Sequence, residues 1–419
     1  MKILLVGHSC APNRGSEPGL TWQFAWHLSQ LHEVWVMTSA RFREPIEKQL
    51  ALTPNDKLHF VWVGPRARSD SPRKPVGELG LRLHYLFWQR AALREARRQH
   101  RLHEFGLIHH LSWGTISAPP ALWRLPIPFV WGPVGGAQTT PWAYRHYLGS
   151  AWPLEVFRTL RVKLVTRMPR LRRTVRNCAL LLSTNPETTR ALHAVGMRRI
   201  QFHPNIGVPE DFLVPVLPKT DRDDREKIIL WAGRMIPIKG LSLALEAFSK
   251  IEPSLRVRLC IAGDGPLKRE MENLARDLGV AGRVDFLGAV PWLEMKRRYQ
   301  DADIFLFTSL RDSSGAVLAE AMASGLPIVT LDHQGAGAIV PAEAGIKVTV
   351  GDPAQTVLAL ADGLRRLIGS HDLRQRMGEV ARARAESMSW TEHAETMSQW
   401  YAQLMAEGDA TEEYAYAAV

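Results

Sequence analysis

Short apolar runs that end in glycine or polar residues recur through this chain, and each is followed by a segment with helical patterning. KILLVG at 2–7 is the first, and a loop and a helix-like segment lead from it to EVWVMTS at 33–39. Runs of this length are typical of buried parallel strands, and a strand, loop, helix and strand in succession form a βαβ unit. The repeated pattern predicts α/β domains built on open parallel sheets.

The length and one polar segment indicate two such domains. The chain has 419 residues, which is too many for one ordinary core. Residues 209–226 are polar and rich in proline, as expected for a linker. We predict an N-terminal Rossmann-like domain at 1–208, a C-terminal one at 227–385, and a last helix at 386–419 that packs back on the N-terminal domain.

The composition favours a globular protein with an anionic partner. Hydrophobic residues make up 46% of the chain, and 53 Lys and Arg against 42 Asp and Glu give a net charge of +11. Such an excess favours a phosphorylated ligand, nucleic acid or an anionic membrane surface. The three cysteines follow no metal or disulfide spacing, and no apolar run is long enough for a signal peptide or a membrane span. We therefore expect a cytoplasmic protein.

Two cations follow a predicted strand in WAGRMIPIKG at 231–240. The strand ends at Gly233, Arg234 follows at once, and Lys239 stands before the next helix. Ligands of open α/β sheets bind beyond the carboxyl ends of strands. Arg can bind phosphate oxygens with two hydrogen bonds and Lys adds a point charge. The alternative is a pair of solvated loop charges.

Two acids, Asp312 and Glu320, flank a turn in RDSSGAVLAEAMASG at 311–325. The turn precedes a helical pattern, and the first amides of a helix have no partner within it and favour anions. The predicted helix start could therefore bind a diphosphate, with Glu320 one turn further on. The alternative is an ordinary helix cap followed by a surface Glu.

The order of these parts resembles the C-terminal domain of glycosyltransferase family 4, whose members are retaining enzymes of the GT-B architecture. GDGP at 263–266 and DADIFLFTS at 301–309 stand between the two loops in the family's order. The family usually has two Glu separated by seven residues, and here the pair is Asp312 and Glu320. The next loop, HQGAGAIV at 333–340, departs from the usual GGxxE-type stretch.

The resemblance implies a fold, a donor and residue roles. The fold would be GT-B, with two doubly wound Rossmann-like domains facing each other across a cleft. Arg234 and Lys239 would hold the diphosphate of a nucleotide sugar, Asp312 would orient the sugar, and Glu320 would bind the ribose. The remaining donor-binding residues would lie near the base and the phosphates: Gly263, Gly265, Pro266, Ser314, Gly315, Ala316 and Val317.

Three further stretches of the N-terminal half are candidates. The family commonly has two glycines in the first strand–helix loop, and here Gly15 is followed by Ser16. LIHHLSWG at 107–114 puts His109 and His110 at a strand end, where the family often has a His that contacts the donor sugar. Strand neighbours face opposite ways, so we expect one of the two to reach the cleft, and which one stays open. WGPVGG at 131–136 is either a ligand loop or a plain tight turn.

No cofactor or metal is expected. Asp301 and Asp303 have the Asp-x-Asp spacing of metal-dependent transferases of a different fold. They stand at the start of an apolar strand, which favours a structural role.

The segment 157–176 combines apolar residues at helical spacing with eight basic residues. Pro169 should kink this helix. It could lie on an anionic membrane, or it could pack on the core with a solvated basic face. Nucleic acid is not expected, because no recognition motif accompanies the charge.

These features together predict a metal-independent, retaining hexosyltransferase. It would move a sugar from a nucleoside diphosphate to a hydroxyl of a carbohydrate or lipid-linked acceptor, on the inner face of a membrane. The alternatives are a nucleotide-sugar-binding protein without efficient transfer, a GT-B epimerase or phosphorylase, and a basic nucleic-acid-binding protein. No lysine site for the cofactor of a phosphorylase is recognisable.

Overall fold

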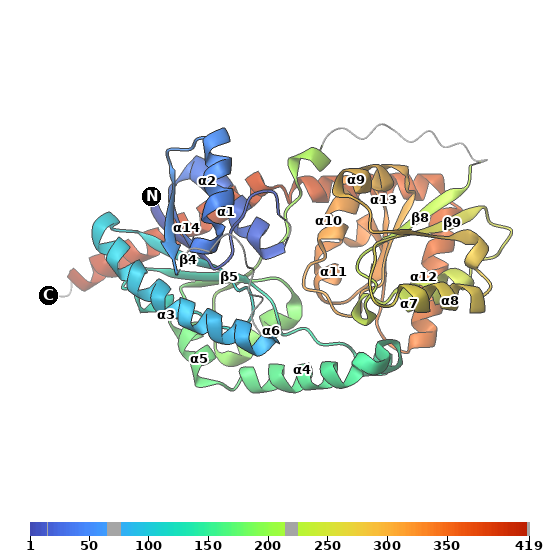
Figure 1. Cartoon of the computed structure of the whole chain (residues 1–419), viewed down its shortest axis with the longest axis horizontal. Helices are drawn as coiled ribbons and strands as arrows, with labels where there is room; N and C mark the ends of the chain where they lie inside the picture. Colours follow the sequence, from blue (N-terminus) through green and yellow to red (C-terminus); the bar gives the residue numbers. More distant parts are fainter. Residues whose placement is uncertain (15, 65–76, 214–224, 417–419) are drawn as a thin grey trace. The chain divides into compact units, whose positions relative to one another are not determined.

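The computed structural model describes residues 1–14, 16–64, 77–213 and 225–416 (Figure 1). The chain forms two compact units. Unit 1 consists of Met1–Ala137, Val162–Asn205 and Trp390–Val419, and unit 2 of Gln138–Arg161 and Ile206–Ser389. Residues 138–161 therefore group with unit 2, although the predicted boundary put them in the N-terminal domain. Most of the predicted linker lies outside the described residues.

Unit 1 is built on a seven-stranded sheet in the order β3-β2-β1-β4-β5-β6-β7, with every pair of neighbours parallel. The strands are β1 (Lys2–Gly7), β2 (Glu33–Ser39), β3 (Leu58–Val63), β4 (Leu107–Ser112), β5 (Phe129–Val134), β6 (Leu180–Ser183) and β7 (Ile200–Phe202). The α-helices are α1 (Ser16–Leu31), α2 (Arg43–Leu52), α3 (Gly77–His103), α5 (Pro169–Arg176), α6 (Pro186–Val195) and α14 (Trp390–Tyr416). The short β7 was not among the strands predicted from the sequence.

Unit 2 repeats this design with a six-stranded parallel sheet in the order β10-β9-β8-β11-β12-β13. The strands are β8 (Lys227–Ala232), β9 (Val257–Ala262), β10 (Val284–Gly288), β11 (Ile304–Phe307), β12 (Ile328–Leu331) and β13 (Gly345–Val348). The helices that follow the strands are α7 (Leu241–Ser249), α8 (Lys268–Asp277), α9 (Trp292–Asp301), α10 (Ala316–Ala323), α11 (Gln334–Ile339), α12 (Pro353–Ile368) and α13 (His371–Glu386). The predicted doubly wound α/β architecture is confirmed in each unit.

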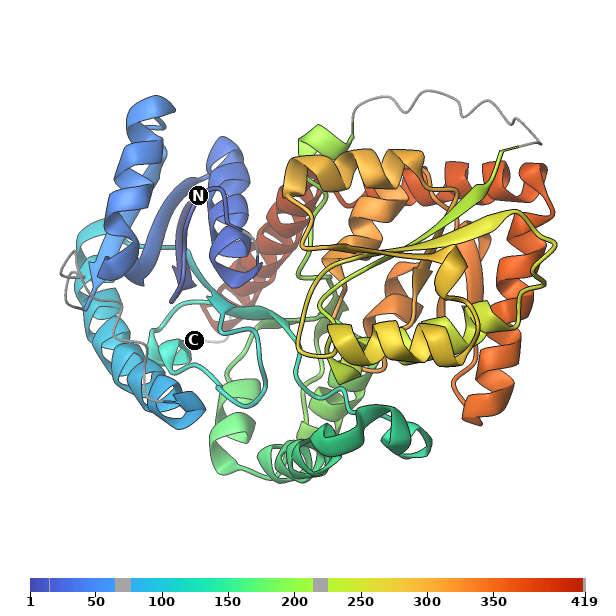
Figure 2. The ribbon, with the colours of Figure 1, turned by 45° about the vertical axis from the view of Figure 1, so that its right-hand side comes forward.

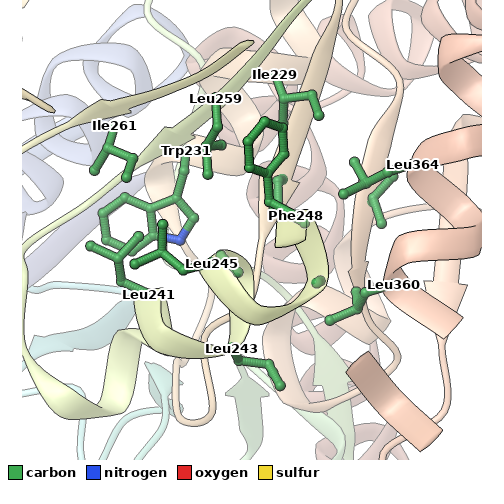
Figure 3. Close-up of a cluster of buried hydrophobic side chains, with 14 of the residues drawn as sticks. Ile229, Trp231, Leu241, Leu243, Leu245, Phe248, Leu259, Ile261, Leu360 and Leu364 are labelled. Carbon is green, nitrogen blue, oxygen red and sulfur yellow. The ribbon is translucent and has the colours of Figure 1, made fainter. Parts of the chain in front are cut away.

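Alternation along the strands explains how helices cover both faces of the unit 2 sheet (Figure 2). Ile229 and Trp231 of β8 pack with Phe248 of α7 on one face. Leu230, between them in sequence, belongs to a separate cluster on the other face. Successive side chains of a strand point to opposite faces, so a strand buried on both sides is apolar throughout. Figure 3 shows the first cluster, in which Leu360 of α12 also packs.

The basic segment 157–176 forms two helices and not one kinked helix. The first is α4 (Trp152–Val165), within which the division between the units falls. The second is α5, and Pro169 occupies its first turn. Proline is favoured there because its missing N–H would have no partner within the helix. Pro169 thus starts a helix in this chain.

Among the described residues, no helix combines the length and the apolar character that crossing a bilayer requires.

Candidate functional site

The strand order brings two of the predicted site loops together in unit 2. β8 and β11 are neighbours at the point where the sheet's order reverses. The loop after β8 carries Arg234 and Lys239, and the loop after β11 carries Asp312. The crevice at this reversal is where open α/β sheets bind ligands.

Backbone contacts fix the two loops against each other. The amide of Leu310 donates to the carbonyl of Ile238 at 2.8 Å, and the hydroxyl of Thr308 donates to the carbonyl of Gly240 at 2.8 Å. A Cβ atom on Gly240 would lie 2.2 Å from the carbonyl oxygen of Thr308, and Gly240 has a φ of 63°. Only glycine permits so close an approach in this conformation. Glycine is therefore required where Lys239 meets the β11 loop.

Lys239 and Asp312 form an ion pair at this junction. Their side chains are 25% and 17% exposed, so the pair is accessible from solvent and only partly screened by it. Arg234 is exposed, and its side chain has no hydrogen bond or ion pair with any described residue. Of the two cations on the β8 loop, one is thus unpaired and the other is neutralised by a carboxylate.

The predicted base-binding glycines have a packing role. A Cβ atom on Gly263 would lie 1.9 Å from the carbonyl oxygen of Gly233, and one on Gly265 would lie 2.6 Å from that of Met235. The β9 loop therefore rests directly on the β8 loop. Pro266, which follows, is exposed.

The start of α10 borders the Lys239–Asp312 pair in sequence. Gly315 caps the helix with a φ of 72°, Ser314 is buried, Ala316 is exposed and Val317 is half-buried. The helix begins at Ala316, where first-turn amides have no partner inside the helix. The amides from Gly315 to Val317 are therefore close in sequence to Asp312 and favour an anion.

Glu320 is half-buried on α10 and accepts a hydrogen bond from the hydroxyl of Tyr299 at 2.8 Å. Burial raises the pKa of the Glu320 carboxyl above its usual range, and the Tyr299 bond opposes this shift. Tyr299 is fully buried on α9. The carboxyl is thus oriented by a neighbour that the sequence did not reveal.

Gln334 supports the Asp312 loop from the stretch that departs from the family pattern. Its side-chain oxygen accepts from the amide of Asp312 at 2.9 Å, and its side-chain nitrogen donates to the carbonyl of Thr139 at 2.8 Å. Gln138 donates to the hydroxyl of Ser313 at 2.6 Å. Sequence reasoning missed both glutamines, which lie far from Asp312 in the chain.

A partly buried ion pair holds Arg311, the neighbour of Asp312. The Nη2 atom of Arg311 donates to Oε1 of Glu155 on α4 at 3.0 Å, and the Nε atom lies 2.9 Å from Oε2 without forming a hydrogen bond. Thr140 also donates to Glu155. Glu155 stands out in the sequence as the only acid between Glu104 and Glu187, but this does not identify Arg311 as its partner.

Neither of the two candidate histidines on β4 reaches a surface, although we predicted that one of them would reach the cleft. His109 and His110 are both fully buried, because β4 is a central strand of a sheet covered on both faces. His109 donates to the carbonyl of Gly132 at 2.8 Å, and His110 lies 2.9 Å from the hydroxyl of Tyr85. Burial lowers the pKa of His109 to about 4 and that of His110 to about 3.

The other candidate residues of unit 1 provide little evidence for a ligand site. Gly15 lies outside the described residues. The nearby Glu17 accepts from the amide of Gly114 at 3.4 Å, and burial raises its pKa. In the stretch 131–136, residues 131–134 belong to β5, and Gly132 packs closely on the backbone of Leu182, so this part of the stretch is strand and not a turn.

Asp303 has a structural role in unit 2. It pairs with Arg225 and accepts from the amide of Ile228 at 2.8 Å. In the part of the chain that the structure describes, no group of three or more His, Cys, Asp or Glu side chains is placed to hold a metal ion.

Comparison with known proteins agrees with this placement. Residues 217–384 match the model of the family "Glycosyl transferases group 1". The matched segment contains all of the unit 2 site residues named above except Gln138, Thr139, Thr140 and Glu155. A D-inositol 3-phosphate glycosyltransferase of Corynebacterium efficiens is 33% identical over 199 residues, which are 44% of this chain and 46% of that protein. The chain thus matches about half the length of this curated relative.

Solved structures share the fold over nearly the whole chain. Sucrose-phosphate synthase from Thermosynechococcus elongatus has a TM-score of 0.64 at 19% identity, covering 97% of this chain and 99% of that one. Anabaena HepE, solved in complex with UDP and glucose, has a TM-score of 0.61 at 18% identity, covering 96% and 100%. The predicted GT-B fold is confirmed.

Proposed function

We propose that this chain is a retaining glycosyltransferase of family 4 that uses a nucleoside diphosphate sugar. The observation that carries the proposal is the junction of the β8 and β11 loops, where Lys239 pairs with Asp312, Arg234 is exposed on the same loop as Lys239, and α10 begins shortly after Asp312 in the sequence. A diphosphate is the ligand that such a set of cations and amides favours. The match of residues 217–384 to group 1 glycosyl transferases and the UDP in the complex of HepE support it.

In this proposal each charged side chain of the site binds one part of the donor. Arg234 and Lys239 neutralise the diphosphate as it leaves, together with the amides from Gly315 to Val317. Lys239 exchanges its bond to Asp312 for one to phosphate, which frees the Asp312 carboxylate for hydroxyls of the donor sugar. Glu320 accepts from the ribose hydroxyls.

The acceptor hydroxyl attacks on the face that the diphosphate leaves, and a phosphate oxygen takes its proton. Configuration at the anomeric carbon is thereby retained without a covalent enzyme intermediate. We propose that no metal ion or cofactor takes part. The acceptor is a carbohydrate or lipid-linked intermediate at the inner face of a membrane.

Titration calorimetry with UDP, GDP and a short RNA tests the ligand class, and product analysis with a panel of nucleotide sugars tests the reaction. A ligand at 100 times its dissociation constant stabilises the fold by about 2.7 kcal/mol, which a thermal-shift screen detects. Nucleotide binding with a new glycoside of the donor's anomeric configuration is the expected result. Binding without transfer would identify a nucleotide-sugar-binding protein, an altered free nucleotide sugar an epimerase, and binding of RNA alone a nucleic-acid-binding protein.

A further inference from the structure

The helix α4 carries large apolar side chains on its solvent face. Leu154, Phe157, Leu160 and Leu164 are 71%, 65%, 59% and 57% exposed. Their spacing of three, three and four residues places them along one side of a helix. Single exposed apolar residues are ordinary on protein surfaces, but four aligned on one helix mark an interaction site.

The opposite side of α4 is buried and carries Glu155 and Val165. Glu155 points into unit 2, where it pairs with Arg311 and accepts from Thr140. The sequence left open whether the apolar residues of 157–176 pack on the core or meet a membrane. Leu171 and Val175 of α5 pack in the core, whereas Leu160 and Leu164 of α4 stay in solvent, so the exposed side of α4 does not serve the core of the protein.

Positive charge surrounds this stripe. Lys163 and Arg167 are exposed at the end of α4 and just after it. In the sequence, no acid occurs between Glu155 and Glu187, and Glu155 is itself buried and paired. The exposed side of this segment is therefore apolar and cationic, which complements an apolar layer bordered by anions.

We propose that α4 docks on an anionic phospholipid bilayer, lying in its plane with Leu154, Phe157, Leu160 and Leu164 between the headgroups and the acyl chains. The 14 residues of α4 span about 21 Å, too short to cross a bilayer but suited to lie along it. A second copy of the chain fits less well, since a symmetric contact would bring Lys163 and Arg167 close to their own copies. This inference goes beyond the proposed reaction and does not depend on it.

Vesicle co-sedimentation with the full chain tests the proposal. Vesicles of phosphatidylcholine with 30% phosphatidylglycerol should bind the protein at least tenfold more tightly than phosphatidylcholine alone, and 0.5 M NaCl should weaken the binding. Replacing Leu154→Gln, Phe157→Gln and Leu160→Gln together should lower the affinity at least tenfold. Glutamine keeps the helix propensity high, and the side chains are exposed, so the fold should persist.

A matched control separates this stripe from exposed apolar residues in general. Leu52, Leu102 and Leu358 are 72%, 63% and 50% exposed on other helices. The triple variant Leu52→Gln, Leu102→Gln and Leu358→Gln should bind vesicles like the wild type. The proposal is overturned if the wild type ignores phosphatidylglycerol vesicles, if both triple variants bind equally, or if the α4 variant changes only the oligomeric state in sedimentation.

Discussion

The two sheets carry different kinds of residues at the point where their strand order reverses. In unit 2, the loops after β8 and β11 hold Arg234 exposed and the Lys239–Asp312 pair accessible. In unit 1, the corresponding strands β1 and β4 lead to His8 and contain His110, which are fully buried. The ring of His8 packs against Trp88, with the centroids 4.9 Å apart.

The difference teaches that strand order alone does not make a ligand site. Both sheets reverse their order between corresponding strands, and both gather polar residues there. In unit 2 glycines pack the loops tightly while Arg234 stays in solvent and Lys239 pairs with Asp312, whereas in unit 1 aromatic rings pack around the His8 imidazole. An anionic ligand therefore has charged partners at the unit 2 edge, and the unit 1 histidines serve the core.

Lowering the pH should destabilise unit 1 more than unit 2, and this is the largest effect that we predict. Burial depresses the pKa of five unit 1 histidines: His8, His32, His109, His110 and His203. Below pH 6.5 the unfolded chain binds protons that the folded unit does not bind. The stability of unit 1 that depends on these neutral histidines is therefore complete above pH 6.5 and falls as the pH drops toward the pKa values of the folded state. Each of His8, His109 and His110 should cost about 2 kcal/mol at pH 5.

Hydrogen exchange followed by peptide mapping at pH 7.5 and pH 5 measures this. Peptides of β1 and β4 should lose protection before those of β8 and β11. Glu17 has the opposite effect on the stability of unit 1. Its pKa is raised in the folded unit, so protonation at falling pH favours the folded state. Equal loss of protection in both units would contradict the contrast drawn here.

Arg234→Ala should lower kcat/KM by about 10²–10³, the usual effect of removing one fixed donor to developing charge. The side chain is exposed and unpaired among the described residues, so the melting temperature should stay unchanged. Arg366→Ala, which removes an exposed arginine of α12, is the control and should keep full activity. If Arg234→Ala stayed within tenfold of the wild type, the diphosphate would bind elsewhere.

Glu155→Gln should lower kcat/KM about tenfold by releasing Arg311 beside Asp312, as expected for loss of about 1.5 kcal/mol from a charged hydrogen bond. The loss should appear in both kcat and KM, because in the proposed mechanism the loop both binds and orients the donor. Glu187→Gln breaks a surface pair with Arg190 and should change neither parameter. A drop in melting temperature with unchanged kinetics would make Glu155 a purely structural residue.

The architecture and the unit 2 loops were predictable from the sequence because they depend on local patterns. Apolar runs gave β1 and β8, and the glycines of the β8 and β9 loops gave the turns. The burial of His109 and His110 was not predictable, since it depends on the strands and helices that flank β4. The partner of Arg311 was hidden for the same reason, as it lies 156 positions away.

The exposed apolar stripe of α4 shows most clearly what the helical spacing of a sequence cannot predict. Helical spacing predicts that Leu160 and Leu164 share a face, which is correct. It does not say which face the protein buries. Contacts between residues far apart in the sequence decide that, since Glu155 pairs with Arg311 and Val165 packs in a hydrophobic core.

Glu320→Gln should have the smallest effect on stability, and in the stabilising direction. A carboxyl with a raised pKa costs folding free energy above that pKa, and the cost disappears as the pH falls to its ordinary value near 4.5. Glutamine removes the charge and keeps an oxygen for the hydroxyl of Tyr299. The melting temperature should rise at pH 8, by about 2–4 °C for each kcal/mol recovered, and the gain should shrink toward pH 4.5.

The same variant should weaken nucleotide binding in calorimetry, since a neutral amide is a poorer acceptor for the ribose hydroxyls than a carboxylate. A residue that costs stability and improves binding is typical of a functional site, and one that does neither is typical of a scaffold. A fall in melting temperature at pH 8 for Glu320→Gln would place Glu320 with the buried histidines of unit 1, as part of the core. A rise with weaker binding would place it with Arg234, at the edge that meets the donor.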